Sequence, residues 1–103
     1  MILVRYVFQA KWGRAGQVAE EFRQNEDLVR RVFGPDVRMR LLTDLSGQFD
    51  TVVQEMEFES LAAWEQGRAA IFSNPEFQKM QQAMGENPYE SGRAELYTIE
   101  ASF

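Results

Sequence analysis

Apolar side chains recur at every second position near the start of the chain, which is the period of a β-strand. The strand predicted at 2–11 has two unlike faces, one with Ile2, Val4, Tyr6, Phe8 and Ala10 and the other with Leu3, Arg5, Val7, Gln9 and Lys11. A glycine-rich turn, WGRAG, follows. Apolar residues then recur at helical spacing until Gly34 and Pro35 stop the helix, and they are Val18, Ala19, Phe22, Val29, Val32 and Phe33. The first unit is therefore predicted to be strand, turn and helix.

A period of two returns after this helix and predicts a hairpin. From residue 37 onward, Val37, Met39, Leu41 and Thr43 alternate with Arg38, Arg40, Leu42 and Asp44. The short turn SGQFD then leads into a second strand, TVVQEMEF.

The remaining pattern predicts a broken helix and a last strand. Ser60 caps a helix on which Leu61, Trp64, Arg68, Ile71 and Phe72 share one stripe, with the alkyl stem of Arg68 able to lie along it. Asn74 and Pro75 start a second helical piece, which carries Phe77, Met80 and Met84 and ends at Gly85. We interpret the break at SNPEF as a helix kink, with a gating hinge as the alternative. After a polar loop, the strand predicted at 93–103 places Glu95, Tyr97, Ile99, Ala101 and Phe103 on one face.

This order, βαββαβ, predicts an α+β fold of the ferredoxin-like type, a four-stranded antiparallel sheet with the helices on one face. With 103 residues, the chain has room for one domain, 1–103. The other face of the sheet is expected to carry Leu3, Val7, Leu42, Val53 and Leu96 among Arg5, Arg38, Arg40, Glu55, Glu57 and Glu100. Because this face is too apolar to leave in water, we predict a homodimer joined sheet to sheet. The charged side chains are interpreted as ion pairs across that interface, and an anion-binding barrel interior is the alternative.

Composition excludes several chemistries. The net charge of −5 opposes binding to nucleic acid. The sequence has no cysteine and no histidine, so it cannot form a Ser-His-Asp or Cys-His nucleophile system, a thiolate or imidazole zinc site, or an imidazole-ligated haem. Its acidic residues lack the spacing of a calcium loop, and we predict no metal and no cofactor. The first apolar run, MILV, is too short for a signal peptide or a membrane span, so we expect a soluble, cytoplasmic protein without a membrane partner.

Two segments resemble a known group of proteins. The opening YVFQAKWGRAGQVAEEF and the later MEFESLAAWEQGRAAIFSNPEF are similar to the dimeric α/β-barrel superfamily, and within it to the NIPSNAP-like and antibiotic-biosynthesis-monooxygenase-like groups. The resemblance covers essentially the whole chain and implies a dimeric α/β barrel. It does not choose an activity, because the superfamily includes cofactor-independent oxygenases of aromatic polyketides, haem-degrading enzymes, stress-response proteins and members of unknown activity. The haem-degrading branch relies on an asparagine in the first strand, a tryptophan and a histidine; Trp64 would match one of these, but the chain has no asparagine at 2–11 and no histidine.

The candidate ligand site is a pocket between helices and sheet, where phenol and indole groups would serve as polar handles. Its predicted residues are Tyr6, Phe22, Met39, Trp64, Arg68, Phe72 and Tyr97. The alternative is that these side chains simply fill the core. Glu20, Glu21, Glu26 and Asp27 are interpreted as the solvated face of the first helix.

We therefore expect an uncharacterised NIPSNAP-like protein that binds a small molecule. One alternative is a cofactor-independent monooxygenase of an aromatic or phenolic compound with Tyr6, Trp64, Arg68 and Tyr97 as its site; the other is a structural or partner-binding homodimer. Catalytic residues, and whether the protein is an enzyme, stay open at this point.

Overall fold

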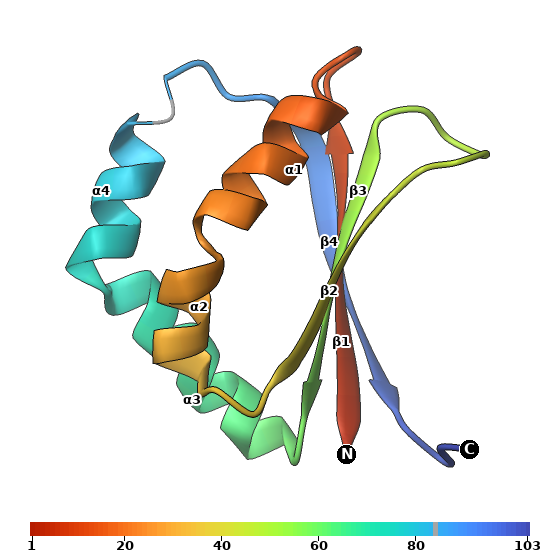
Figure 1. The fold of residues 1–103 in the computed structure, drawn as a ribbon, viewed down its shortest axis with the longest axis vertical. Helices are drawn as coiled ribbons and strands as arrows, with labels where there is room; N and C mark the ends of the chain where they lie inside the picture. The colour runs from red at the N-terminus through yellow and green to blue at the C-terminus, as the bar shows by residue number, and fades with distance from the viewer. Residues whose placement is uncertain (84) are drawn as a thin grey trace.

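The computed structural model describes residues 1–83 and 85–103, and it confirms the ferredoxin-like fold. Its elements in chain order are β1 (Ile2–Ala10), α1 (Ala15–Gln24), α2 (Glu26–Phe33), β2 (Arg38–Thr43), β3 (Thr51–Phe58), α3 (Leu61–Ser73), α4 (Pro75–Ala83) and β4 (Tyr89–Thr98). The strands form one antiparallel sheet in the order β2-β3-β1-β4. All helices cover the same face of this sheet, and its other face is open (Figure 1).

Each predicted helical region is divided in two. The first breaks at Asn25, a division that the periodicity did not predict; the backbone N–H of Asn25 donates to Glu21 O and Phe22 O, at 3.1 and 3.2 Å. The second breaks at Asn74 as predicted, where Asn74 Oδ1 accepts from the backbone N–H of Glu76 and of Phe77. Ser60 Oγ caps α3 as predicted, at 3.1 Å from Ala63 N. The predicted position of Met84 lies outside the described residues.

The last strand differs from its prediction in both position and facing. It begins at Tyr89, opposite Ala10, and ends at Thr98, opposite Ile2, because β1 offers no strand partner beyond that point. Its register against β1 decides which side chains share a face. Leu96 lies opposite Val4 on the helix side, Tyr97 lies opposite Leu3 on the open side, and Glu100 lies outside the strand. The predictions of Leu96 and Glu100 on the open face were therefore wrong.

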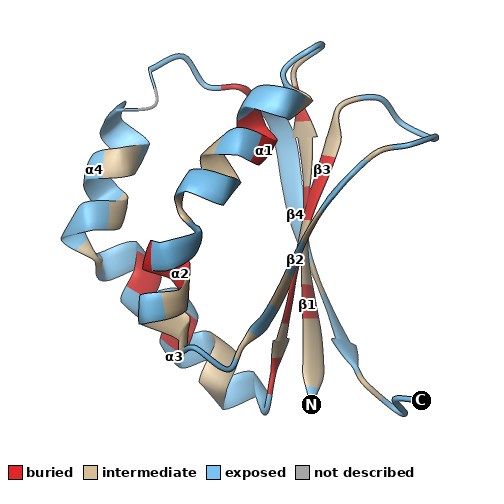
Figure 2. Ribbon diagram, viewed as in Figure 1, coloured by how far each residue is buried: buried red, intermediate tan, exposed pale blue. Residues whose placement is uncertain are grey.

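The core lies between the helices and the central strands (Figure 2). One buried cluster joins Val4, Val29, Met56 and Phe58, with Met39 packed against it as the predicted alternation requires. A second cluster joins Ala10, Val18 and Val52. The central strands β1 and β3 supply most of these residues, so the edge strands remain more exposed.

Asp50, at the end of the loop between β2 and β3, is hydrogen-bonded to the start of α1. Its carboxylate accepts hydrogen bonds from the backbone N–H of Gly13, at 2.9 Å, and of Ala15, at 3.2 Å. Asp50 itself has a φ of 60°, which is unusual for a residue other than glycine. The residue before α1, Arg14, makes no side-chain cap. A distant aspartate therefore supplies the cap that the local sequence lacks.

Gly67 on α3 is expected to tolerate no side chain, because an added Cβ would collide with the ring of Phe33 on α2. Phe33 packs edge-on against Phe58, with ring centroids 5.6 Å apart, so it cannot move freely. Overpacking of this kind costs about 1–3 kcal/mol. The higher helix propensity of alanine offsets roughly 1 kcal/mol of that cost. Because the added Cβ would overlap with Phe33 Cδ1, the upper end of the range applies, and Gly67→Ala should lower the free energy of unfolding in urea by about 2 kcal/mol.

Gly16→Ala is the matched control, since a Cβ at Gly16 on α1 meets no described atom within 4 Å. This variant should be neutral or slightly stabilising. A Gly67→Ala protein as stable as the Gly16→Ala protein would contradict the packing of α2 against α3.

Candidate functional site

The side chains predicted to line one pocket do not share one. Tyr6 on β1 and Trp64 on α3 do meet, and the indole Nε1–H donates to the Tyr6 hydroxyl at 2.8 Å. This bond satisfies the indole N–H of half-buried Trp64 and gives the Tyr6 oxygen a donor. Met39 on β2 and Phe22 on α1 instead line a separate small hollow of about 150 Å³.

Arg68 and Phe72 lie on an exposed part of α3. The Arg68 guanidinium lies over the rings of Trp64 and Phe72, 5.7 and 5.8 Å from their centroids. Phe72 is 54% exposed and meets Phe77 of α4 edge-on. Arg68 therefore stacks on two rings and does not bend toward Tyr6.

Tyr97 was placed wrongly by the sequence. Because β4 pairs Tyr97 with Leu3, the phenol lies on the open face of the sheet, where its hydroxyl donates to Glu95 Oε1 at 3.1 Å. The sheet itself separates Tyr97 from Trp64. A phenol–indole site made of Tyr6, Trp64 and Tyr97 is thus absent from this fold.

A larger cavity, of about 410 Å³, lies between α1, α4 and the β1–β4 edge of the sheet. We call it the helix–sheet cavity. Its apolar walls are Phe8, Phe22, Phe77, Met80 and Tyr89. The ring of Phe8 lies 5.4 Å from that of Phe22 and 5.3 Å from that of Tyr89. Phe22 is the one residue of the predicted pocket that lines this cavity.

Glu21 is the charged residue of the cavity wall, and its prediction as a solvated residue was wrong. Its Oε2 is shielded from solvent and has no hydrogen-bond partner among the described residues. Its Oε1 lies 3.5 Å from the side-chain amide of Gln17. The sequence did contain a signal, because Glu21 follows the buried Val18 by three positions and so borders the buried stripe of α1. Glu20, Glu26 and Asp27 are exposed as predicted.

Tyr89 lines the same cavity as Glu21, and the charge of Glu21 affects the pKa of its phenol. Burial first, and the negative charge of Glu21 second, raise the pKa of Tyr89 above its ordinary value of 10.0. The phenol is therefore neutral at physiological pH and keeps its proton for a hydrogen bond. The sequence placed Tyr89 in a loop, because the residues around it lack strand alternation.

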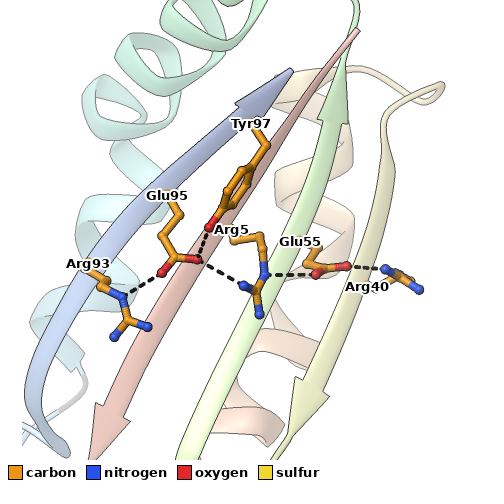
Figure 3. A network of polar contacts seen from close by, with 6 residues as sticks. All are labelled: Arg5, Arg40, Glu55, Arg93, Glu95 and Tyr97. Atoms are coloured by element: carbon orange, nitrogen blue, oxygen red, sulfur yellow. Dashed lines mark hydrogen bonds and ion pairs between the residues drawn. The ribbon is translucent and has the colours of Figure 1, made fainter. Parts of the chain in front are cut away.

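The open face of the sheet carries a network of ion pairs between arginine and glutamate side chains (Figure 3). Buried Glu55 on β3 accepts from Arg5, at 3.1 Å, and from Arg40. Arg5 also donates to Glu95 at 3.0 Å, and Glu95 accepts from Arg93 at 2.8 Å. The hydrogen bond from Arg93 and the neighbouring positive charges hold the pKa of Glu95 below its ordinary value. These ion pairs, predicted to cross a dimer interface, form within one chain.

Apolar side chains surround this network. Val7 and Val53 are buried on the open face, and Leu42 is 37% exposed. They border a shallow hollow of about 660 Å³ that reaches the β2–β3 connection. The open face thus combines an apolar floor with paired charges.

Neither a membrane span nor a metal cluster is found in the described part of the chain. Of the helices at 1–83 and 85–103, none is long and apolar enough to cross a membrane. Within the same residues, no three acidic side chains lie grouped as metal ligands.

Comparison with known proteins shows the fold. The chain is similar to an uncharacterised NIPSNAP domain protein from Burkholderia xenovorans, with a TM-score of 0.80, 16% identity and coverage of 98% of this chain and 96% of that one. It is also similar to a NIPSNAP family protein from Agrobacterium tumefaciens, with a TM-score of 0.80, 12% identity and coverage of 94% and 90%. SnoaB, a cofactor-independent oxygenase from Streptomyces nogalater, has a TM-score of 0.68, 16% identity and coverage of 98% and 94%. No protein-family model and no curated protein matches the sequence.

Proposed function

We propose that this protein binds a small aromatic molecule in the helix–sheet cavity. The observation that carries this proposal is the cavity itself, a space of about 410 Å³ walled by aromatic rings and one carboxylate that is partly withdrawn from water. Pockets for small ligands commonly have about 300–1,000 Å³, apolar walls and a few polar groups. Glu21 and Tyr89 would supply those polar groups.

We propose further that the binding unit is a homodimer joined through the open sheet faces. Val7, Leu42 and Val53 would be covered by a second copy, together with the paired charges of Arg5 and Glu55 on the central strands. A two-fold interface of this kind leaves the helix–sheet cavity on the outer side of each subunit, because the cavity lies on the opposite face of the sheet.

Filling the cavity is the direct test. Ala83→Trp adds an indole at a residue of the cavity wall, and it should weaken binding of aromatic fragments at least about tenfold, as followed by ligand-observed NMR. Native mass spectrometry of the protein as purified should show an adduct in the wild type that the variant lacks. Ala70→Trp is the matched control, on the exposed part of α3 away from the cavity, and it should bind normally.

Equal loss of binding in both variants would point to disturbed folding, and equal binding in both would contradict the cavity. A dimer without an adduct and without affinity for any aromatic fragment would favour the alternative of a purely structural homodimer.

A second candidate function is favoured by Glu21. In a cofactor-independent monooxygenase, a carboxylate withdrawn from water can accept the proton of a phenolic substrate, whose anion then reacts with dioxygen. SnoaB, which is similar in fold, is described as a cofactor-independent oxygenase. The site of such an activity would consist of Glu21 and Tyr89, in place of the predicted Tyr6, Trp64, Arg68 and Tyr97. Dioxygen uptake that depends on a phenolic compound and disappears in Glu21→Gln would support it.

A further inference from the structure

The formal charge that lines the helix–sheet cavity is negative. Among its described lining residues, Glu21 alone carries a formal charge, and the remaining polar groups are neutral: the amides of Gln24, Asn25 and Gln81 and the phenol of Tyr89. A bound molecule therefore meets one carboxylate and no guanidinium or ammonium group of the described wall.

Lys79 of α4 is exposed and does not line the cavity, and other basic side chains near it pair elsewhere. Arg23 of α1 pairs with Glu20 at 3.1 Å, and Arg30 of α2 pairs with Glu26 at 3.0 Å. Lys11, next to β1, lies 3.9 Å from Glu86. No ion pair joins Glu21 to a lysine or arginine of the described residues. The carboxylate thus lacks the partner that a partly buried charge normally has.

The walls around Glu21 suit a cation. Phe8, Phe22, Phe77 and Tyr89 present aromatic rings, whose faces attract positive charge, and Met80 adds a polarisable sulfur. Aromatic rings around a carboxylate are the arrangement expected for recognition of an ammonium group attached to an apolar body. An anion would meet the opposite conditions, because Glu21 would repel it and no positive charge of the described wall would offset its lost hydration.

We propose that the cavity selects protonated amines, with the ammonium group paired to the Glu21 carboxylate and the apolar part held among the aromatic rings. This inference rests on the proposed binding function and specifies its ligand class. Tyr89 responds to the same carboxylate. Burial, and after it the negative charge of Glu21, raise the pKa of the phenol, so a second negative charge at this wall is disfavoured.

Three probes of similar size and shape test the inference: phenethylamine, which is cationic at pH 7, phenethyl alcohol, which is neutral, and 3-phenylpropionate, which is anionic. Dissociation constants are measured by NMR titration of the full chain. We expect the amine to bind at least about tenfold more tightly than the alcohol, and the carboxylate to bind most weakly. In Glu21→Gln the amine and the alcohol should bind within about twofold of each other.

Glu20→Gln is the matched control, because it removes the same charge one residue earlier on an exposed part of α1, and it should retain the preference for the amine. The pKa of Tyr89, followed by NMR, reports whether Glu21→Gln is folded as intended. The pKa of Tyr89 should fall when the carboxylate is neutralised but stay above 10.0, because burial is the larger cause of its shift.

The outcomes separate the two proposals. Equal affinity for amine and alcohol in the wild type would overturn the selection of cations while leaving the binding function intact. A preference for the amine that survives in Glu21→Gln would overturn the role of Glu21. Failure of all three probes, with Tyr89 titrating as expected, would overturn this inference; failure of a broader set of aromatic fragments would overturn the proposed binding function as well.

Discussion

Replacing Glu55 by alanine is expected to lower the free energy of unfolding by about 2–3 kcal/mol. Glu55 is 7% exposed and is held between Arg5 and Arg40, so its loss leaves two guanidinium groups on neighbouring strands without their shared carboxylate. Removing one partner of a fully buried pair costs about 3–5 kcal/mol. The cost here should be lower, because the side chains of Arg5 and Arg40 are 32% and 71% exposed and can be hydrated. Urea denaturation at neutral pH measures the effect.

Glu57→Ala is the control for this experiment. Glu57 lies two residues further along β3 on the same face, and its contact with Arg38 is longer, at 3.9 Å, and more exposed. It should cost less than about 1 kcal/mol. If both variants lose the same stability, the effect reflects a general need for carboxylates on the open face, and the network around Glu55 has no special role.

Replacing Leu42 by lysine is expected to turn the proposed dimer into monomers. The new ammonium group would lie on the open face, in the hollow that Arg5 also lines, and a two-fold interface would contain two such groups. Burying them without partners should raise the dissociation constant of the dimer at least about a hundredfold. Because Leu42 is already 37% exposed and lies on an edge strand, the isolated subunit should keep its fold. Sedimentation equilibrium gives the constant, and circular dichroism checks the fold.

Leu61→Lys provides the comparison, since Leu61 is 50% exposed at the start of α3, on the helix side. It should leave the association unchanged. A wild type that sediments as a monomer at micromolar concentration would show that the open face is not a self-association surface. A Leu42→Lys protein that stays dimeric would show that the interface lies elsewhere.

Local patterns in the sequence were sufficient for the element order. The alternation through β1 and β2 placed Met39 on the helix side, and the caps at Ser60 and Asn74 follow from residue types that accept backbone hydrogen bonds. Short-range chemistry decides these features, and it can be read from neighbouring residues. The fold followed from them because few topologies accommodate this order.

The features that were missed depend on contacts between distant segments. The stretch from Tyr89 to Leu96 has no clear alternation, and its facing is decided by pairing with β1, which put Tyr97 on the open side. The cavity depends on how the rings of Phe8, Phe22 and Tyr89 fill the space between α1 and the sheet. Residue types predict that aromatic side chains are buried, but they do not predict which of them leave a space.

The hydrogen bonds from Gly13 and Ala15 to Asp50 would link the proposed ligand binding to the proposed subunit association. Asp50 lies at the start of β3, beside the hollow of the open face, and α1 carries Glu21 and Phe22 into the cavity on the other side of the sheet. If the β2–β3 connection shifts when the proposed dimer forms, these hydrogen bonds would move α1, and with it the part of the cavity wall that α1 provides. Linkage is reciprocal, so a molecule that binds the dimer more tightly than the monomer must strengthen the dimer by the same factor.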